Sequence, residues 1–308
     1  MPFFSIIIPT FNRAALLREA LASVARQTFR DFEVIVVDDG SRDETESVVN
    51  SCDLPVTFLR QENRGPGAAR NLAIQHSQGR YIAFLDSDDQ WLPWTLAIYQ
   101  RIIVTQNQPA FMSGLALPLD GRPASPAMEA TALDIRSFSH LLEACTDRVP
   151  PVGGTPSICL NRLALEETGG FASRKINGED TDLWLRLGLK PGFVRILNPP
   201  VFLQRKHSGN VTNQLEPSLA GARYLMHQER TSAFPGGKAY RQKRRRIICG
   251  TVRSLSLECL QAGRPADACS LYFSSFAWNL GLANLKYLAG FPLLAAGSFA
   301  NNRFVKRS

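Results

Sequence analysis

The feature that most constrains the fold is the alternation of short apolar runs with amphipathic stretches in the first half of the chain. The apolar runs indicate buried strands, and apolar residues at helical spacing, such as Leu17, Leu21 and Val24, indicate helices between them. This order is typical of an α/β protein whose mainly parallel sheet carries helices on both faces. The predicted strands are Phe3–Ile8, Phe32–Val37, Val56–Leu59 and Tyr81–Leu85, and further helices are predicted at Glu44–Asn50, Pro66–His76 and Pro93–Gln106.

The remainder of the chain is less regular. Between residues 107 and 155, a stretch rich in Pro, Gly and Ala, the pattern predicts a strand near Phe111–Leu117 and a helix near Ser137–Ala144. Strands are expected at Thr155–Leu160 and Phe193–Leu197, with a helix entered through Gly178–Leu189 between them. Beyond Pro217 the periodicity is helical to the end.

Basic residues are concentrated in the C-terminal quarter. Residues 236–308 hold 12 Lys or Arg and only 2 Asp or Glu, whereas the whole chain has a net charge of +8. Beside apolar helices, such a stretch is compatible with binding to an anionic membrane surface. It is also compatible with a helical bundle that has a solvated basic face. Nucleic-acid binding is disfavoured because no motif for it is present.

Cysteine usage and the N-terminus favour a cytoplasmic protein. The six cysteines are scattered without a C-x-x-C pair, which argues against a zinc site or a disulfide framework. The first apolar run is short, has no basic lead-in and meets Pro9 at once, which disfavours a signal peptide.

Acidic residues follow two of the predicted strands directly. Asp86-Ser87-Asp88-Asp89 comes after the fourth strand, and carboxylates are the ligands that Mg²⁺ and Mn²⁺ prefer beside substrate phosphates. Asp38-Asp39-Gly40-Ser41 closes the second strand, where an acid can bind a nucleoside. Because parallel strands end at one edge of a sheet, these clusters are expected to meet there. The alternatives are a solvated turn at the first cluster and a turn with a helix cap at the second.

Two further segments carry charged candidates, each with a structural alternative. Arg70, in Gly65-Pro66-Gly67-Ala68-Ala69-Arg70-Asn71, is placed to reach a nucleotide phosphate or base, although a single Arg is by default a surface residue. Asp180 begins a predicted helix and is either a cap or a general base that accepts a proton from an attacking hydroxyl. His207 is either structural or a ligand of metal or phosphate.

Together these motifs resemble the family-2 glycosyltransferases with the GT-A fold. The resemblance rests on Ser5-Ile6-Ile7-Ile8-Pro9-Thr10-Phe11-Asn12-Arg13, Val36-Val37-Asp38-Asp39-Gly40-Ser41, Glu62-Asn63-Arg64-Gly65 through Asn71, and Phe84-Leu85-Asp86-Ser87-Asp88-Asp89. Gly169-Gly170-Phe171 and Gly178-Glu179-Asp180-Thr181-Asp182-Leu183-Trp184 resemble the acceptor-side motif of that family. The resemblance to this family covers about residues 3–215. It implies a nucleotide-sugar transferase domain over 1–215 and a basic helical extension over 216–308.

The resemblance implies an inverting transfer from a nucleotide-diphosphate sugar, often a UDP-sugar, to an acceptor hydroxyl with the help of Mn²⁺ or Mg²⁺. It implies Asp180 as the catalytic base and Asp88, with His207, at the metal. The acceptor would be a saccharide or a lipid-linked sugar in bacterial surface polysaccharide or glycolipid assembly. The residues that it places at the nucleotide or substrate are Pro9, Thr10, Phe11, Arg13, Asp39, Arg70, Asp86, Glu179 and Trp184.

One departure from the pattern of this family narrows the predicted activity, and two alternative functions stay open. The Q-x-x-R-W signature of processive members is absent after the predicted base, and no run of about 18 apolar residues predicts a membrane span, so addition of one or a few sugars is expected. The alternatives are a non-catalytic nucleotide-sugar-binding module and a sugar nucleotidyltransferase. The latter normally has a glycine-rich, lysine-bearing loop after the first strand, and residues 9–13 contain neither Gly nor Lys.

Overall fold

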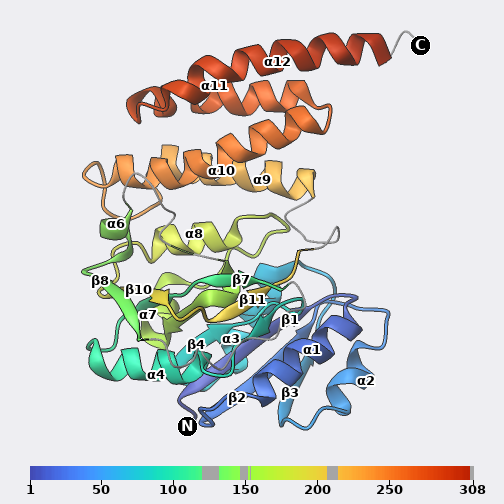
Figure 1. Ribbon diagram of the computed structural model, residues 1–308, viewed down its shortest axis with the longest axis vertical. Helices are drawn as coiled ribbons and strands as arrows, with labels where there is room; N and C mark the ends of the chain where they lie inside the picture. The colour runs from blue at the N-terminus through green and yellow to red at the C-terminus, as the bar shows by residue number, and fades with distance from the viewer. Residues whose placement is uncertain (120–131, 146–151, 153, 207–213, 306–308) are drawn as a thin grey trace. The chain divides into compact units, whose positions relative to one another are not determined.

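The computed structural model describes residues 1–119, 132–145, 152, 154–206 and 214–305. The chain divides into two compact units. The first comprises residues 1–175 together with 179–208, and the second comprises 176–178 together with 209–308. The sheets belong to the first unit, and the second unit is built from long helices (Figure 1).

An eight-stranded sheet forms the centre of the first unit, in the order β3-β2-β1-β4-β9-β6-β10-β8. The neighbours β3, β2, β1 and β4 are parallel, as the strand–helix alternation predicted. The strands are β1 (Phe4–Thr10), β2 (Phe32–Asp38), β3 (Val56–Arg60), β4 (Tyr81–Phe84), β6 (Phe111–Ser113), β8 (Asp134–Phe138), β9 (Ile158–Asn161) and β10 (Phe193–Asn198). A second, three-stranded sheet has the order β5 (Gln90–Trp91), β11 (Phe202–Gln204), β7 (Ala116–Pro118).

Helices connect and flank these strands. They are α1 (Ala14–Ala25), α2 (Thr45–Asn50), α3 (Pro66–His76), α4 (Thr95–Thr105), α6 (Leu141–Ala144), α7 (Arg162–Thr168) and α8 (Glu179–Arg186), with a 3₁₀ turn, η1, at Thr155–Ser157. The predicted helix Pro66–His76 has the observed bounds, and the predicted helices that became α2 and α4 differ from them by one or two residues at their ends.

Beyond β4 the sheet is mixed rather than parallel. Strand β9 runs antiparallel to both of its neighbours, β4 and β6, and β8 is antiparallel to β10. The predicted strand Phe111–Leu117 is two strands in different sheets, β6 and β7, separated at Gly114. A Cβ at Gly114 would lie 2.3 Å from a methyl group of Val201, so the chain bends where only glycine fits.

Two more expectations for this region were confirmed only in part. The helix predicted near Ser137–Ala144 is instead the strand β8 followed by the short helix α6, because residues 134–138 pair with β10. The predicted strand Thr155–Leu160 begins as the turn η1, with Pro156 in its first turn. Pairing partners far away in the sequence decided both cases.

The core of the first unit lies on both faces of the large sheet. Ile6 and Ile8 of β1 belong to a buried apolar cluster that also contains residues of α1 and α4. Ile7, which points to the opposite face, belongs to a second cluster with Ala69 of α3 and Leu183 of α8. This alternation along one strand confirms the predicted α/β class, with helices packed on both faces of the sheet.

The second unit contains α9 (Leu215–Arg230), α10 (Arg241–Gln261), α11 (Pro265–Gly281) and α12 (Leu285–Val305). Ile248, Val252, Leu255 and Cys259 of α10 are buried. Residues 262–264 separate α10 from α11, which begins at Pro265. Among the described residues, no helix combines the length and hydropathy that a membrane span needs.

The basic run Arg241–Arg246 is partly structural. Arg244 is 2% exposed, and its guanidinium donates to the buried carboxylate of Glu229 at 2.7 and 3.3 Å. It also donates to the carbonyl oxygens of Pro235 and Gly237. Arg245 lies over the ring of Trp278, 4.7 Å from its centroid. The run therefore does not face solvent as a whole, and part of its charge holds α9 against α10.

We expect Arg244→Met to lower the free energy of unfolding by about 3–5 kcal/mol, because the buried Glu229 carboxylate loses both hydrogen bonds from Arg244 and keeps only the looser pair with Arg245 at 3.7 Å. Arg223→Met is the matched control, since Arg223 pairs with Asp267 at 3.1 Å on the surface and is half exposed. Its loss should cost less than about 1 kcal/mol. Urea unfolding monitored by circular dichroism measures both values, and equal costs would contradict this role of Arg244.

Candidate active site

The motif residues of the first half lie along one edge of the large sheet. Strands β2, β1 and β4 are adjacent and parallel, so the residues that follow them come together at their carboxyl ends. Thr10 ends β1, Asp39 follows β2, and Asp86 and Asp88 follow β4. This is the edge at which α/β sheets bind ligands.

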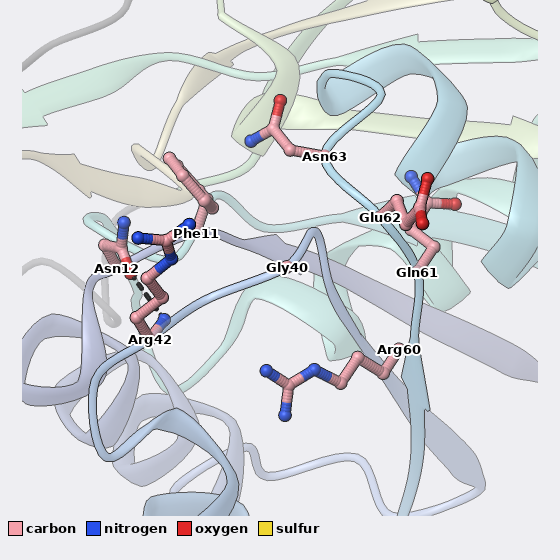
Figure 2. Close-up of a pocket in the computed structure, with 8 residues that line it drawn as sticks. All are labelled: Phe11, Asn12, Gly40, Arg42, Arg60, Gln61, Glu62 and Asn63. Atoms are coloured by element: carbon pink, nitrogen blue, oxygen red, sulfur yellow. Dashed lines mark hydrogen bonds between the residues drawn. The ribbon is translucent and has the colours of Figure 1, made fainter.

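An open pocket of about 870 Å³ lies at this edge. Phe11 and Asn12 follow β1, and the other lining residues come from the β2–α2 loop, the end of β3 and the loop before α3. Figure 2 shows the side chains that line the pocket, among them the ring of Phe11 and the guanidinium of Arg42. Because this ring is 43% exposed, its face is available for stacking against a planar ligand such as a nucleobase. The lining residues are Phe11, Asn12, Gly40, Arg42, Arg60, Gln61, Glu62 and Asn63.

Hydrogen bonds between loops fix the shape of this pocket. The backbone N–H of Asn12 donates to Ser41 Oγ at 2.8 Å, and the side-chain oxygen of Asn12 accepts from the N–H of Arg42 at 2.8 Å (Figure 2). Asn12 has φ of 51°, a conformation that Asn tolerates better than most residues. The sequence analysis gave Asn12 no role of its own, although an Asn just after a strand is a turn signal.

Asp39 holds the loop before α3. Its carboxylate accepts hydrogen bonds from Gln61 Nε2 at 2.7 Å and from the backbone N–H groups of Arg64 and Gly65 at 2.8 and 2.9 Å. Asp39 is 4% exposed. A carboxylate can accept more than three hydrogen bonds. The predicted contact of Asp39 with a nucleoside would therefore use the acceptor positions on its oxygens that these three bonds leave open.

Asp88 faces a cation within the protein. Its carboxylate accepts from Arg13 at 2.6 Å, and its side chain is 11% exposed. Arg205, just after β11, donates through its backbone N–H to Asp89 at 2.9 Å and through Nε to the Asp88 carbonyl at 3.2 Å. The arginine also contacts Glu19 of α1. These contacts fix the turn that carries Asp88 between β4 and the segment after β11.

The chemistry of the acidic turn is compatible with a divalent metal. Its three aspartates offer the oxygen ligands that Mg²⁺ and Mn²⁺ prefer. In the part of the chain that the structure describes, no group of three or more His, Cys, Asp or Glu is arranged to hold a metal ion. A site with one or two protein carboxylates leaves the other positions to phosphate and water. His207, the other predicted ligand, lies outside the described residues.

Arg70 joins the Asp86 turn to the start of α8. Its guanidinium donates to Asp86 at 2.8 Å and to Glu179 at 2.8 Å. It also lies 5.2 Å from the centroid of the Phe171 ring, and Arg70 as a whole is 4% exposed. The arginine is thus buried between two acids, and not on the pocket surface where a nucleotide contact was predicted.

Burial and charge oppose each other at this bridge. Burial by itself lowers the pKa of Arg70, but the facing carboxylates of Asp86 and Glu179 outweigh it and raise the pKa above its ordinary value. Burial raises the pKa of Glu179 to about 7, against the opposing effect of Arg70. Removing the arginine would leave the buried carboxylate of Glu179 without its cation.

Asp180 lies in the first turn of α8, next to Glu179. Its carboxylate accepts from the Thr181 backbone N–H at 2.5 Å and from the Thr181 hydroxyl at 3.2 Å. The electrostatic influence of Asp180 reaches both Arg70 and Glu179. The structure therefore brings the predicted base close to the bridge that begins at Asp86, and its half-buried side chain retains contact with solvent.

Comparison with known proteins agrees with this arrangement. Residues 5–108 match the family described as Glycosyl transferase family 2. This segment of the chain is therefore a family-2 glycosyltransferase segment, and the match does not extend beyond residue 108. The match includes β1, β2, β4 and the edge residues from Pro9 to Asp89.

Curated relatives match only part of their own length. The chain is 30% identical over 188 residues to an uncharacterized glycosyltransferase of Rickettsia felis, a match that covers 60% of this chain and 30% of that protein. It is 41% identical over 102 residues to the GalNAc(5)-diNAcBac-PP-undecaprenol beta-1,3-glucosyltransferase of Campylobacter jejuni, which covers 32% and 33%. The chain thus spans about a third of the length of these relatives.

Solved structures share the fold. S. aureus TarS 1-349 in complex with UDP-GlcNAc superposes with a TM-score of 0.56 and 20% identity over 90% of this chain and 92% of that one. The mannosyltransferase PcManGT from Pyrobaculum calidifontis, in complex with GDP-Man and Mn2+, has a TM-score of 0.56 and 22% identity over 97% and 85%. The predicted GT-A-type fold is thereby confirmed.

Sequence reasoning missed the residue that positions the Gly169-Gly170-Phe171 motif in this protein. The side chain of Asn71 accepts from the Phe171 N–H at 2.8 Å and donates to the Phe171 carbonyl at 2.9 Å. Gly170 has φ of 73°, and a Cβ there would lie 2.6 Å from the Asn71 oxygen. Asn71 directly follows Arg70 in α3, so this helix holds the segment before α8 at two points.

The remaining predicted site residues are placed as follows. Pro9 and Thr10 are buried at the end of β1, and the hydroxyl of Thr10 is buried with no hydrogen-bond partner among the described residues. Trp184 is 5% exposed and packs against Phe111 and Phe171 in the core. The structure thus places Trp184 away from the pocket surface, and it stabilises the packing of α8 on the sheet.

Proposed function

We propose that this chain is an inverting glycosyltransferase that moves a sugar from a UDP-sugar to an acceptor hydroxyl. The observation that supports this most is that Arg70 joins the acidic turn of Asp86 and Asp88 to the start of α8, where Asp180 lies. Nucleotide-sugar complexes of the structural neighbours TarS and PcManGT are in keeping with it.

The donor would lie along the sheet edge. The exposed face of Phe11 would stack on the base, and the unpartnered Thr10 hydroxyl would accept or donate a hydrogen bond to the nucleoside. Arg13 pairs with Asp88 and is placed to meet the diphosphate once that carboxylate turns to other ligands. Asp88, with the predicted ligand His207, would hold Mn²⁺ or Mg²⁺, which would neutralise the developing charge on the diphosphate when bound.

Asp180 would remove the acceptor proton. The acceptor oxygen would form a bond to the anomeric carbon as the bond from that carbon to the diphosphate breaks, and the carboxylate would take the hydroxyl proton. A single displacement of this kind inverts the anomeric carbon and needs no covalent enzyme intermediate. Glu179, held by Arg70, would fix the start of α8 and therefore the position of Asp180.

The acceptor in this proposal is a saccharide or lipid-linked sugar of bacterial surface polysaccharide or glycolipid assembly, reached from the cytoplasmic face of the membrane. The Campylobacter jejuni relative is named as a glucosyltransferase of an undecaprenol-linked glycan. Peripheral binding to that membrane belongs to the same proposal.

A thermal-shift experiment with UDP, GDP, dTDP and CMP, each with and without Mn²⁺, tests the donor site. We expect UDP with Mn²⁺ to stabilise the protein by about 2.7 kcal/mol at 100 times its dissociation constant. For a protein of this size, that is a rise in melting temperature of several degrees, at about 2–4 °C per kcal/mol. Asp88→Asn should lose the metal-dependent part of the shift.

Glu167→Asn is the control for this experiment, because Glu167 is an exposed acid that pairs with Lys190. It should retain the full metal-dependent shift. A folded protein that no nucleotide stabilises, with or without metal, would contradict the proposed donor site. A shift that Asp88→Asn leaves intact would contradict the assignment of the metal to this turn.

A further inference from the structure

The helical unit exposes an apolar surface on α11 and α12. Phe273, Phe276 and Leu280 lie at positions i, i+3 and i+7 of α11, so they share one face of that helix. On α12, Leu285, Leu293 and Leu294 are exposed. Phe273 is 71% exposed and Leu293 is 77% exposed. We call these six residues the α11–α12 surface.

Interior packing leaves this surface outside. Tyr287 and Phe291 of α12 face α11, where Phe291 stacks on Tyr272 with ring centroids 4.5 Å apart. The rings of Phe273 and Phe276 contact the same Tyr272, so the exposed part of α11 adjoins α12. The two helices thus pack against each other through these aromatic rings and still present large apolar side chains to solvent. Clustered exposure of this kind marks an interaction site.

The charge of this part of the sequence distinguishes between partners. From Ala268 to Ser308 the chain has no Asp or Glu, while it has four basic residues, Lys286, Arg303, Lys306 and Arg307. Two copies of such a segment would bring like charges together. An anionic lipid surface offers both an apolar layer and the opposite charge.

We propose that the α11–α12 surface binds an anionic lipid bilayer, with its apolar side chains at the boundary between headgroups and acyl chains. This inference rests on the proposed function, which includes peripheral membrane binding, and it names the surface that would carry that binding. It differs from the expectation drawn from the basic run at 241–246, where Arg244 is buried and Arg245 lies on Trp278.

Flotation of the full chain with vesicles tests the proposal. Wild-type protein should float with phosphatidylcholine vesicles that contain phosphatidylglycerol, and less with pure phosphatidylcholine. High NaCl should weaken the binding, because salt screens the charge contribution. Leu293→Gln combined with Leu294→Gln should lower the partition coefficient by at least about tenfold, since both apolar side chains would lose their lipid contact.

The matched control is Val104→Gln combined with Leu163→Gln. These residues are 66% and 67% exposed and belong to the other unit. The control should float like wild type. Nucleotide-induced stabilisation should persist in both double variants, which separates failure of the lipid surface from failure of the proposed donor site.

Three results would overturn the proposal. The first is that wild-type protein does not float with anionic vesicles at low salt. The second is that the Leu293→Gln, Leu294→Gln variant floats as well as wild type. The third is that light scattering finds a dimer in solution that this variant dissociates, because the surface would then join two copies of the chain. In addition, equal binding to neutral and anionic vesicles would contradict the proposed preference of this surface for anionic lipids.

Discussion

Arg70→Met should abolish most of the transfer activity and also destabilise the protein. The variant leaves the buried Glu179 carboxylate without its cation, and breaking a buried pair in this way costs about 3–5 kcal/mol, whereas Asp86, whose side chain is 30% exposed, keeps access to solvent. The start of α8 then loses its fixed position relative to the Asp86 turn. A displacement of about 1 Å at the base is sufficient to lower turnover roughly 100-fold.

Two comparisons separate these effects. Arg64→Met, six residues earlier, removes an exposed arginine and should change neither stability nor turnover appreciably. Arg70→Lys keeps the positive charge but cannot reach both acids with a planar fork, so it should recover stability better than it recovers kcat. Turnover should be measured at a temperature where circular dichroism finds each variant folded. Wild-type kcat in folded Arg70→Met would contradict the positioning role.

Asp180→Asn should lower kcat by about 10²–10⁴-fold, the usual contribution of a general base. Asn is a good helix cap, so the start of α8 should remain intact and stability should change little. Asp180 does not line the pocket that we propose for the nucleotide, so UDP with Mn²⁺ should stabilise the variant as it stabilises wild type. Initial rates of transfer and thermal shifts on the same preparation measure both quantities.

The control for this prediction is Glu216→Gln. Glu216 is also an acid in the first turn of a helix, α9, but it pairs with Arg264 on the surface. It should leave kcat unchanged. If Asp180→Asn keeps wild-type turnover, Asp180 only caps α8 and the base must be sought elsewhere. Loss of nucleotide binding together with turnover would likewise contradict a role limited to proton transfer.

Local patterns predicted the regular first half of the fold well. Strands β1, β2 and β4 are short, largely buried apolar runs, and β3 is a partly exposed edge strand. Their neighbours in the sequence are helices, so the parallel order follows from chain connectivity. The region from 111 to 161 was less predictable. There β6, β8 and β9 acquire their partners from strands far away in the sequence, and β9 reverses the direction of the sheet.

The candidate site likewise has features that the sequence predicted and features that depend on distant partners. Sequence determined which residues reach the sheet edge, because Thr10, Asp39, Asp86 and Asp88 directly follow strands whose carboxyl ends must coincide. It also determined the helical start at Glu179 and Asp180, from acids that precede an apolar helical stretch.

Only the tertiary structure decided what each of these side chains contacts. Asp39 is engaged by the loop before α3, Trp184 is part of the core, and Arg70 joins two acids that are 93 residues apart in the sequence, Asp86 and Glu179. The physical reason is that a charged side chain is placed by the nearest opposite charge in a poorly solvated interior, and the identity of that partner depends on how distant segments pack.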